Sequence, residues 1–117
     1  MKEIRIMVGL TTKEKNAMVL DAVRRFEAGE ITEDQPTILN FESWEHMTRT
    51  LTSGRLELLR HLHRHPTASI YALAQALGRK YPNVHADVQA LTEAGLIERD
   101  ETGLHFDYDE VSFKLAV

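Results

Sequence analysis

The side chains best suited to chemistry in this sequence are the polar and basic groups of residues 79–89, Arg-Lys-Tyr-Pro-Asn-Val-His-Ala-Asp-Val-Gln. Asparagine and glutamine can each form two hydrogen bonds with the edge of adenine in the major groove of DNA. Arginine and lysine bind phosphate groups, and so do the free amides in the first turn of a helix. This combination predicts contact with DNA rather than a covalent reaction.

The apolar residues of this segment recur at helical spacing. Val84, Val88 and Leu91 fall on one side of a helix that begins near Tyr81-Pro82, where proline is favoured because first-turn amides lack an intrahelical partner. The opposite side is polar, with a small alanine that can approach a thymine methyl group. The predicted DNA-contacting residues are Ser69, Tyr71, Arg79, Lys80, Tyr81, Asn83, His85, Ala86, Gln89 and Arg99.

Two shorter helices are expected ahead of this one. Thr52 or Ser53 can cap the first, which Pro66 stops. Ser69 can cap the second, which ends at Gly78 because glycine readily adopts a left-handed conformation. Only a few residues separate Gly78 from the third helix, so the turn between them is tight.

A hairpin is expected after the third helix, which Gly95 ends. The apolar stretches Leu96-Ile97 and 104–108 flank the turn Asp100-Glu101-Thr102-Gly103. Three helices, a tight turn between the second and third, and a hairpin are the order of elements in a winged helix-turn-helix. In that fold the third helix enters the major groove.

Residues 1–45 are expected to form a strand-helix-strand extension. Residues 4–8 alternate as a half-buried strand does. Thr11 and Glu14 have the spacing of a capping box, and Gly29 can end the helix that follows. Residues 29–37 are predicted to be a polar connection and residues 38–41 a second strand. The helix would carry one apolar stripe, made of Val19, Ala22, Val23 and Phe26.

Ser43 can cap a further short helix, in which we expect Trp44 to pack in the core with Met47 and Leu51. Residues 111–115 alternate as a last strand. The fold class expected is therefore α+β, a winged helix-turn-helix with an N-terminal strand-helix-strand extension. Residues 1–45 would serve dimerisation or toxin contact, and residues 46–117 would form the DNA-binding domain with the C-terminal strand.

Charge is unevenly distributed along the chain. The net charge is −4, but residues 49–86 carry the single acid Glu57. The basic residues of that segment are Arg49, Arg55, Arg60, Arg64, Arg79 and Lys80. Local potential matters more than total charge for binding a polyanion, so this segment could bind DNA, although a solvated helical surface would have the same composition.

Several functional classes are not expected. The chain has no cysteine, which excludes disulfides, thiolate metal sites and cysteine catalysis. His61 and His65 share a helical face, but no other ligands cluster with them, so neither a metal nor a cofactor is expected. Serines stand at helix starts, where capping explains them, and we expect no enzyme activity. No segment has the apolar length of a signal peptide or membrane helix, so a cytoplasmic protein without membrane contact is expected.

One phrase, Gly78-Arg79 followed by Asn83-Val84-His85-Ala86-Asp87-Val88, gives a resemblance to a known family. Together with Arg55-Leu56-Glu57-Leu58-Leu59 and the motif of residues 73–78, it resembles a prokaryotic family of small DNA-binding proteins related to MarR-type winged-helix regulators. Members of that family are often the antitoxin of a type II toxin–antitoxin pair. The resemblance implies a homodimer that binds an operator in double-stranded DNA, represses its own operon and neutralises a cognate toxin protein, with no catalytic residues.

Two features differ from a typical DNA-binding winged helix. The hairpin is acidic around its single basic residue, Arg99. This acidity limits contact of the hairpin with the minor groove. Asp87 projects near the buried side of the third helix, where we expect it to pair with Arg55 or Arg79. The alternative functions are a winged-helix protein-interaction module that does not bind DNA and a stand-alone MarR-like repressor that responds to a ligand.

Overall fold

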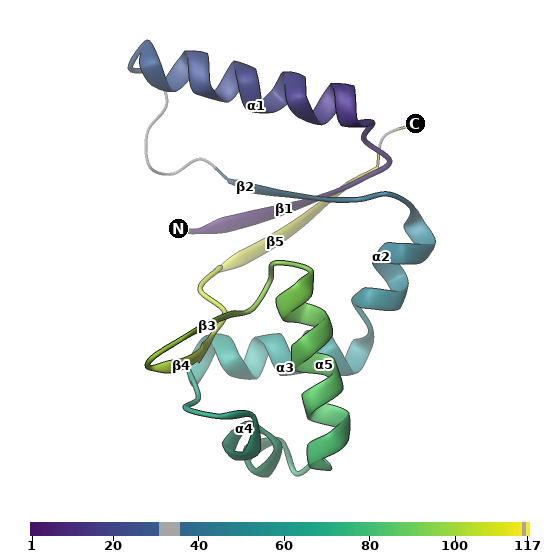
Figure 1. Ribbon diagram of the computed structural model, residues 1–117, viewed down its shortest axis with the longest axis vertical. Coiled ribbons are helices and arrows are strands. Elements are labelled where there is room, and N and C mark those ends of the chain that lie inside the picture. Colours follow the sequence, from purple (N-terminus) through teal and green to yellow (C-terminus); the bar gives the residue numbers. More distant parts are fainter. Residues whose placement is uncertain (31–35, 116) are drawn as a thin grey trace. The chain divides into compact units, whose positions relative to one another are not determined.

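The computed structural model describes residues 1–30, 36–115 and 117, and it divides into two compact α+β units (Figure 1). Unit 1 consists of Met1–Met47 and Tyr108–Val117, and unit 2 consists of Thr48–Asp107. The first boundary lies two residues from the expected one. The C-terminal strand, however, does not lie with the second domain as expected, because its backbone pairs with the first strand of the chain.

Unit 1 contains a three-stranded parallel sheet. Its strands are β1 (Glu3–Val8), β2 (Thr37–Phe41) and β5 (Glu110–Leu115), in the order β2-β1-β5. Ile4, Ile6 and Val8 of β1 are buried, as their alternation predicts. Ile6 lies opposite Leu39 on one side and Phe113 on the other. The chain thus builds this sheet from segments that are far apart in sequence.

Helix α1 (Thr12–Glu27) connects β1 to β2 and has no buried side chain. Thr11 accepts a hydrogen bond from the backbone N–H of Glu14, as the capping-box spacing predicts, and Gly29 follows with φ of 75°. Its apolar side chains are exposed, up to 71% for Phe26. The polar connection predicted at residues 29–37 lies partly outside the described residues.

Helix α2 (Trp44–Thr50) begins after Ser43, whose hydroxyl accepts a hydrogen bond from the backbone N–H of His46. The prediction that Trp44 is a core residue is wrong, because its side chain is 51% exposed. Met47, three residues further along on nearly the same side of α2, is buried, so contact with the core begins one turn after Trp44.

Unit 2 contains α3 (Ser53–Arg64), α4 (Ile70–Leu77), α5 (Tyr81–Glu93) and a hairpin of β3 (Glu98–Asp100) and β4 (Gly103–His105). Thr52 and Ser69 cap α3 and α4, and Gly78 ends α4 in the left-handed conformation, as the sequence predicts. The buried apolar residues of the unit are Leu58, Leu59, Leu62, Ile70, Leu73, Ala74, Val84, Val88, Leu91, Leu96, Ile97, Leu104 and Phe106.

The hairpin is attached to the segment between α3 and α4 by a short antiparallel bridge. The N–H of Leu104 donates to the carbonyl of Thr67 at 2.7 Å, and the N–H of Thr67 donates back at 3.3 Å. Gly103 has φ of 129°, and a Cβ there would lie 2.8 Å from Cα of Ala68. The first strand of the hairpin begins at Glu98, later than predicted. Leu96 and Ile97 precede it and are buried.

Candidate nucleic-acid interface

Helix α5 has one buried and one exposed side. Val84, Val88 and Leu91 are almost completely buried, as their spacing predicts. Residues on the other side have exposed side chains, and these are Pro82, Asn83, His85, Ala86 and Gln89. Unit 2 therefore holds α5 by its apolar side and exposes its amides, imidazole and small alanine to another molecule.

The N-terminus of α5 is exposed and positively charged. Lys80 is the N-cap residue, and no side chain caps the helix there. Tyr81 follows with a partly exposed ring, whose centroid lies 5.8 Å from that of His85. Pro82 has no N–H and the N–H of Asn83 donates to the carbonyl oxygen of Lys80 at 3.2 Å, so it is the positive end of the helix dipole next to the lysine that suits this terminus to a phosphate group.

A hollow in unit 2 brings three of the predicted contact residues together. It has a volume of about 340 Å³ and is lined by Ile70, His85, Gln89, Thr92, Glu93 and Arg99. Arg99 of the hairpin thus lies beside the polar side of α5. A ligand seated there could contact an imidazole, an amide and a guanidinium at once.

Sequence reasoning missed the acidic residue of this hollow. The amide of Gln89 donates to the carboxylate of Glu93 at 3.5 Å. The i,i+4 spacing of the two residues on one helix was the signal that could have revealed the contact. Glu93 places a negative charge near Arg99 and restricts where a phosphate can approach.

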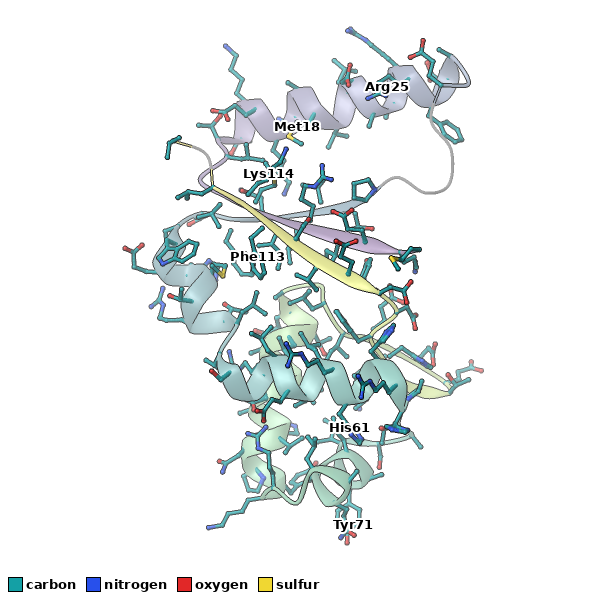
Figure 2. All side chains as sticks on the ribbon, turned by 180° about the vertical axis from the view of Figure 1, so that it is seen from behind. Met18, Arg25, His61, Tyr71, Phe113 and Lys114 are labelled. Carbon is teal, nitrogen blue, oxygen red and sulfur yellow. The ribbon has the colours of Figure 1, made fainter. Side chains whose placement is uncertain are left out.

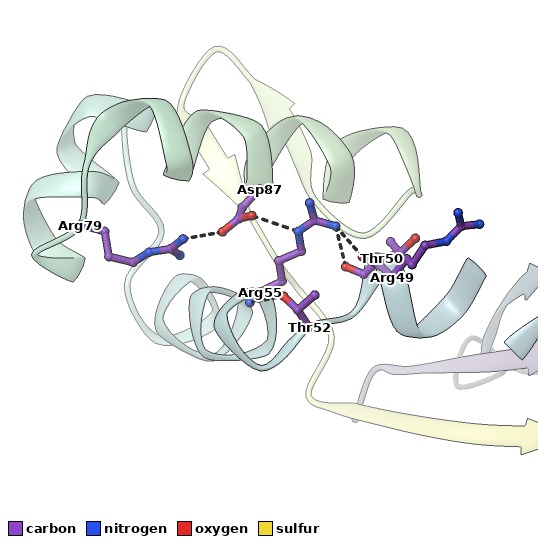
Figure 3. A network of polar contacts seen from close by, with 6 residues as sticks. All are labelled: Arg49, Thr50, Thr52, Arg55, Arg79 and Asp87. Carbon is purple, nitrogen blue, oxygen red and sulfur yellow. Dashed lines mark hydrogen bonds and ion pairs between the residues drawn. The ribbon is translucent and has the colours of Figure 1, made fainter. Parts of the chain in front are cut away.

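Asp87 pairs with two arginines from different elements (Figure 3). Its carboxylate accepts from Nε of Arg55 at 3.0 Å and from Nη2 of Arg79 at 2.7 Å. Arg55 also donates to the carbonyl oxygens of Arg49 and Thr50, at 3.1 and 3.0 Å. The network therefore fixes α5 to the start of α3 and to the turn after α4.

The expectation that Asp87 pairs with Arg55 or Arg79 is confirmed, and both arginines take part. Arg79 is also a predicted phosphate contact, and the ion pair with Asp87 makes its guanidinium less available for that contact. Its side chain is one-third exposed and its guanidinium is directed toward Asp87 (Figure 3). Of the two basic residues before α5, Lys80 is consequently the better placed to bind an anion.

The two predicted contact residues of α4 both have internal partners. The hydroxyl of Ser69 caps the helix by accepting from the N–H of Ala72 at 3.1 Å. The hydroxyl of Tyr71 accepts from Nε2 of Gln75 at 2.7 Å, and its ring projects outward from α4 (Figure 2). Tyr71 therefore remains accessible to a partner.

One acidic residue of the hairpin, Asp100, stabilises its turn. Asp100 accepts hydrogen bonds from the N–H and hydroxyl of Thr102 and from the N–H of Gly103. The hydrogen bonds from Thr102, aided by His105 nearby, lower the pKa of Asp100 to about 2. The carboxylate closes the turn, and Arg99 is exposed beside it.

Neither a metal cluster nor a membrane-spanning helix emerges from the structure. Within residues 1–30, 36–115 and 117, no three histidine or acidic side chains are grouped to hold a metal ion. In the same ranges, every helix is too short or too polar to cross a bilayer.

Comparisons with known proteins give one family. No curated protein and no solved structure matches the chain. The model of the family HVO_A0114 matches residues 50–113, which include all of α3, α4, α5 and the hairpin. Since the match spans more than half of the sequence, this chain belongs to the HVO_A0114 family.

Proposed function

We propose that unit 2 is a winged helix-turn-helix that binds double-stranded DNA, with α5 as its recognition helix. The observation that carries this proposal is the exposed polar side of α5, with Asn83, Ala86 and Gln89 directed away from the core. Amide side chains on an outward-facing helix can form paired hydrogen bonds with adenine in the major groove. The hairpin is then the wing.

The distribution of charge also supports α5 as the part of unit 2 that faces DNA. Lys80 stands at the N-terminus of α5, where its ammonium group and the positive end of the helix dipole can attract one phosphate. Arg99 offers a second positive group from the hairpin side of the hollow. Because Arg55 and Arg79 neutralise Asp87, this acid of α5 does not repel the duplex as a free carboxylate would, and Glu93 is the acid of α5 that a phosphate must avoid.

Replacing Lys80 with alanine tests the phosphate contact. We expect Lys80→Ala to weaken binding to all duplexes and to reduce the slope of log K against log salt by about one. Fluorescence anisotropy with a labelled random duplex over a salt series measures both. Lys15→Ala, on α1 of unit 1, is the matched control and should leave the slope unchanged. An equal slope in wild type and Lys80→Ala would remove Lys80 from the interface.

Replacing the amides of α5 tests base reading. Asn83→Ala and Gln89→Ala should each relax sequence preference, at a cost of ~1–3 kcal/mol on the preferred site. Selection from a random duplex library, followed by titration of the selected site, measures the change. Gln75→Ala removes the same amide group from α4 and should preserve the preferred sequence. Unaltered preferences in both α5 variants would assign base reading to other residues.

The proposal extends to biological role through the resemblance to antitoxin-type repressors. On that basis the protein is a homodimeric repressor of its own operon and neutralises a toxin encoded beside it. A reporter fused to its promoter and co-expression with the adjacent gene test the two parts separately. Growth inhibition by the neighbour that this chain relieves would support neutralisation, and a harmless neighbour would leave a repressor alone.

A protein-interaction module is the second candidate. The observation that favours it is the exposed apolar side of α1, which unit 1 does not bury. Stable co-purification with a protein, together with no gel shift at low salt, would favour this candidate over DNA binding.

A further inference from the structure

Strand β5 forms an open edge of the unit 1 sheet. The strand order is β2-β1-β5, so one side of β5 pairs with β1 and its outer side has no strand partner among the described residues. Two large apolar side chains on β5 are exposed, Phe113 at 50% and Leu115 at 57%. Such an edge readily pairs with another strand.

The sequence of β5 is complementary to itself when two copies run antiparallel. We propose that β5 pairs with β5 of a second copy of this chain, with the two-fold axis passing at Ser112. In that register Glu110 lies opposite the partner's Lys114, and Val111 lies opposite the partner's Phe113. Each pair occurs twice by symmetry. Cross-strand pairs of opposite charge and of apolar side chains are the contacts that stabilise antiparallel strands.

The two kinds of pair also lie on the correct faces. Side chains alternate along a strand, so Glu110, Ser112 and Lys114 share one face of the sheet, and Val111 and Phe113 share the other. Figure 2 shows Lys114 and Phe113 pointing to opposite sides of the sheet. Within residues 110–114 the charged pairs therefore form on one face and the apolar pairs on the other, and Leu115 extends beyond the end of the partner's β5.

Charge selects this register over its neighbours. With the axis at Val111, Glu110 lies opposite the partner's Ser112, and with the axis at Phe113, Ser112 lies opposite the partner's Lys114. Neither arrangement pairs opposite charges. A lysine on an edge strand normally discourages pairing. Here it permits one register in which every copy of Lys114 meets a carboxylate.

The other open edge lacks these features. Strand β2, Thr-Ile-Leu-Asn-Phe, has no charged side chain to select a register. The apolar side chains of α1 are exposed, but they define no strand register that charged pairs could select. Strand β5 is consequently the edge on which a second copy of this chain fits best. The inference concerns unit 1 alone, so it can fail while DNA binding by unit 2 holds.

Cross-linking through cysteine tests the axis directly. The full-length chain contains no cysteine, so Ser112→Cys introduces a single thiol. Directly opposed residues of antiparallel strands have Cα atoms about 4.5–5.5 Å apart, within the range that a disulfide spans. We expect oxidised Ser112→Cys to run as a covalent dimer on non-reducing gels. Thr37→Cys is the control, because Thr37 is exposed on β2 at the opposite edge of the sheet and takes no part in the proposed contact.

Charge reversal tests the pairs themselves. Lys114→Glu and Glu110→Lys each place like charges opposite one another twice, and we expect each to raise the dimer dissociation constant at least about tenfold. The double variant Glu110→Lys/Lys114→Glu restores opposite charges and should restore the dimer. Sedimentation velocity at low salt measures the dissociation constant of each full-length variant, and circular dichroism reports whether it is folded.

Several outcomes would overturn the proposal. A monomeric wild-type chain at high micromolar concentration would overturn it outright. A dimer that Ser112→Cys does not cross-link, or that Thr37→Cys cross-links equally well, would place the interface elsewhere, for example on α1 or β2. Failure of the double charge variant to recover while remaining folded would show that the Glu110–Lys114 pairs do not set the register.

Discussion

The carboxylate of Asp87 pairs with two arginines in unit 2, so the loss of its charge should lower the free energy of unfolding. Asp87→Asn keeps the shape of the side chain but removes the charge that Arg55 and Arg79 share. Hydrogen bonds to charged groups contribute about 1.5–3 kcal/mol each, so we expect unfolding free energy to fall by about 2 kcal/mol or more. Urea denaturation measures it. Asp107→Asn, an exposed acid in the same unit, should change stability little.

Gly103 is required by the bridge between the hairpin and Thr67. An alanine there would have an unfavourable φ and a Cβ against the backbone of Ala68, so Gly103→Ala should destabilise unit 2 by about 1–3 kcal/mol or more. Gly54→Ala, in the first turn of α3 where a Cβ meets nothing within 4 Å, should instead be neutral or stabilising. Thermal denaturation of both variants measures the contrast. Equal melting temperatures would refute the requirement at Gly103.

Asp100 gives the hairpin a dependence on acid. Hydrogen bonds from Thr102 hold the pKa of Asp100 at about 2, below the ordinary 3.8. Its contribution to stability is therefore complete above pH 3.8 and is lost as the pH falls through about 2. We expect Asp100→Asn to flatten the fall in stability over this interval. Carboxyl chemical shifts followed by NMR give the pKa directly, and a value near 3.8 would contradict the turn geometry.

At the scale of single residues, local signals predicted well and tertiary ones predicted poorly. The caps at Thr11, Thr52 and Ser69 follow from hydroxyls spaced against backbone amides a few residues away. The pairing of Asp87 was predictable because a carboxylate near the buried side of a helix needs a cation. The exposure of Trp44 was not, because periodicity does not specify which turn of a short helix faces the core.

Helix α1 is the element whose stability depends least on the rest of unit 1. None of its side chains is buried, so capping, i,i+4 pairs such as Asp21–Arg25 and intrinsic propensity must hold it. We expect its backbone amides to exchange with deuterium much faster than those of β1, whose alternate side chains are buried. Hydrogen exchange measured by mass spectrometry compares the two segments. Equal protection would show that a partner covers α1 in solution.

The sequence predicted which elements exist more reliably than how they associate. Alternation in residues 4–8 and 111–115 identifies both strands, but no local signal states that they pair in parallel. For the same reason the sequence does not indicate that the C-terminal strand belongs to unit 1. In the candidate interface, helical spacing predicted the exposed side of α5, whereas the position of Arg99 beside Gln89 depends on how the hairpin folds back.

At the scale of the whole molecule, unit 2 is one continuous segment with its own core. A fragment of residues 48–107 should therefore fold without unit 1, although a domain of this size is only marginally stable. We expect a cooperative thermal transition by circular dichroism, weak binding to random duplexes and a monomeric mass. A fragment without a cooperative transition would show that unit 1 contributes to the core of unit 2.

The pairing of Glu3 with Glu110 joins strands from opposite ends of the sequence. Synthesis proceeds from the N-terminus, so the segment 48–107 can fold before β5 exists. A chain truncated before residue 110 would carry the proposed recognition helix but not β5, the strand proposed to pair with a second copy. If unit 2 binds DNA and β5 pairs two copies, as we propose, such a truncated product would bind DNA only as a single subunit and would not form mixed dimers with the longer chain.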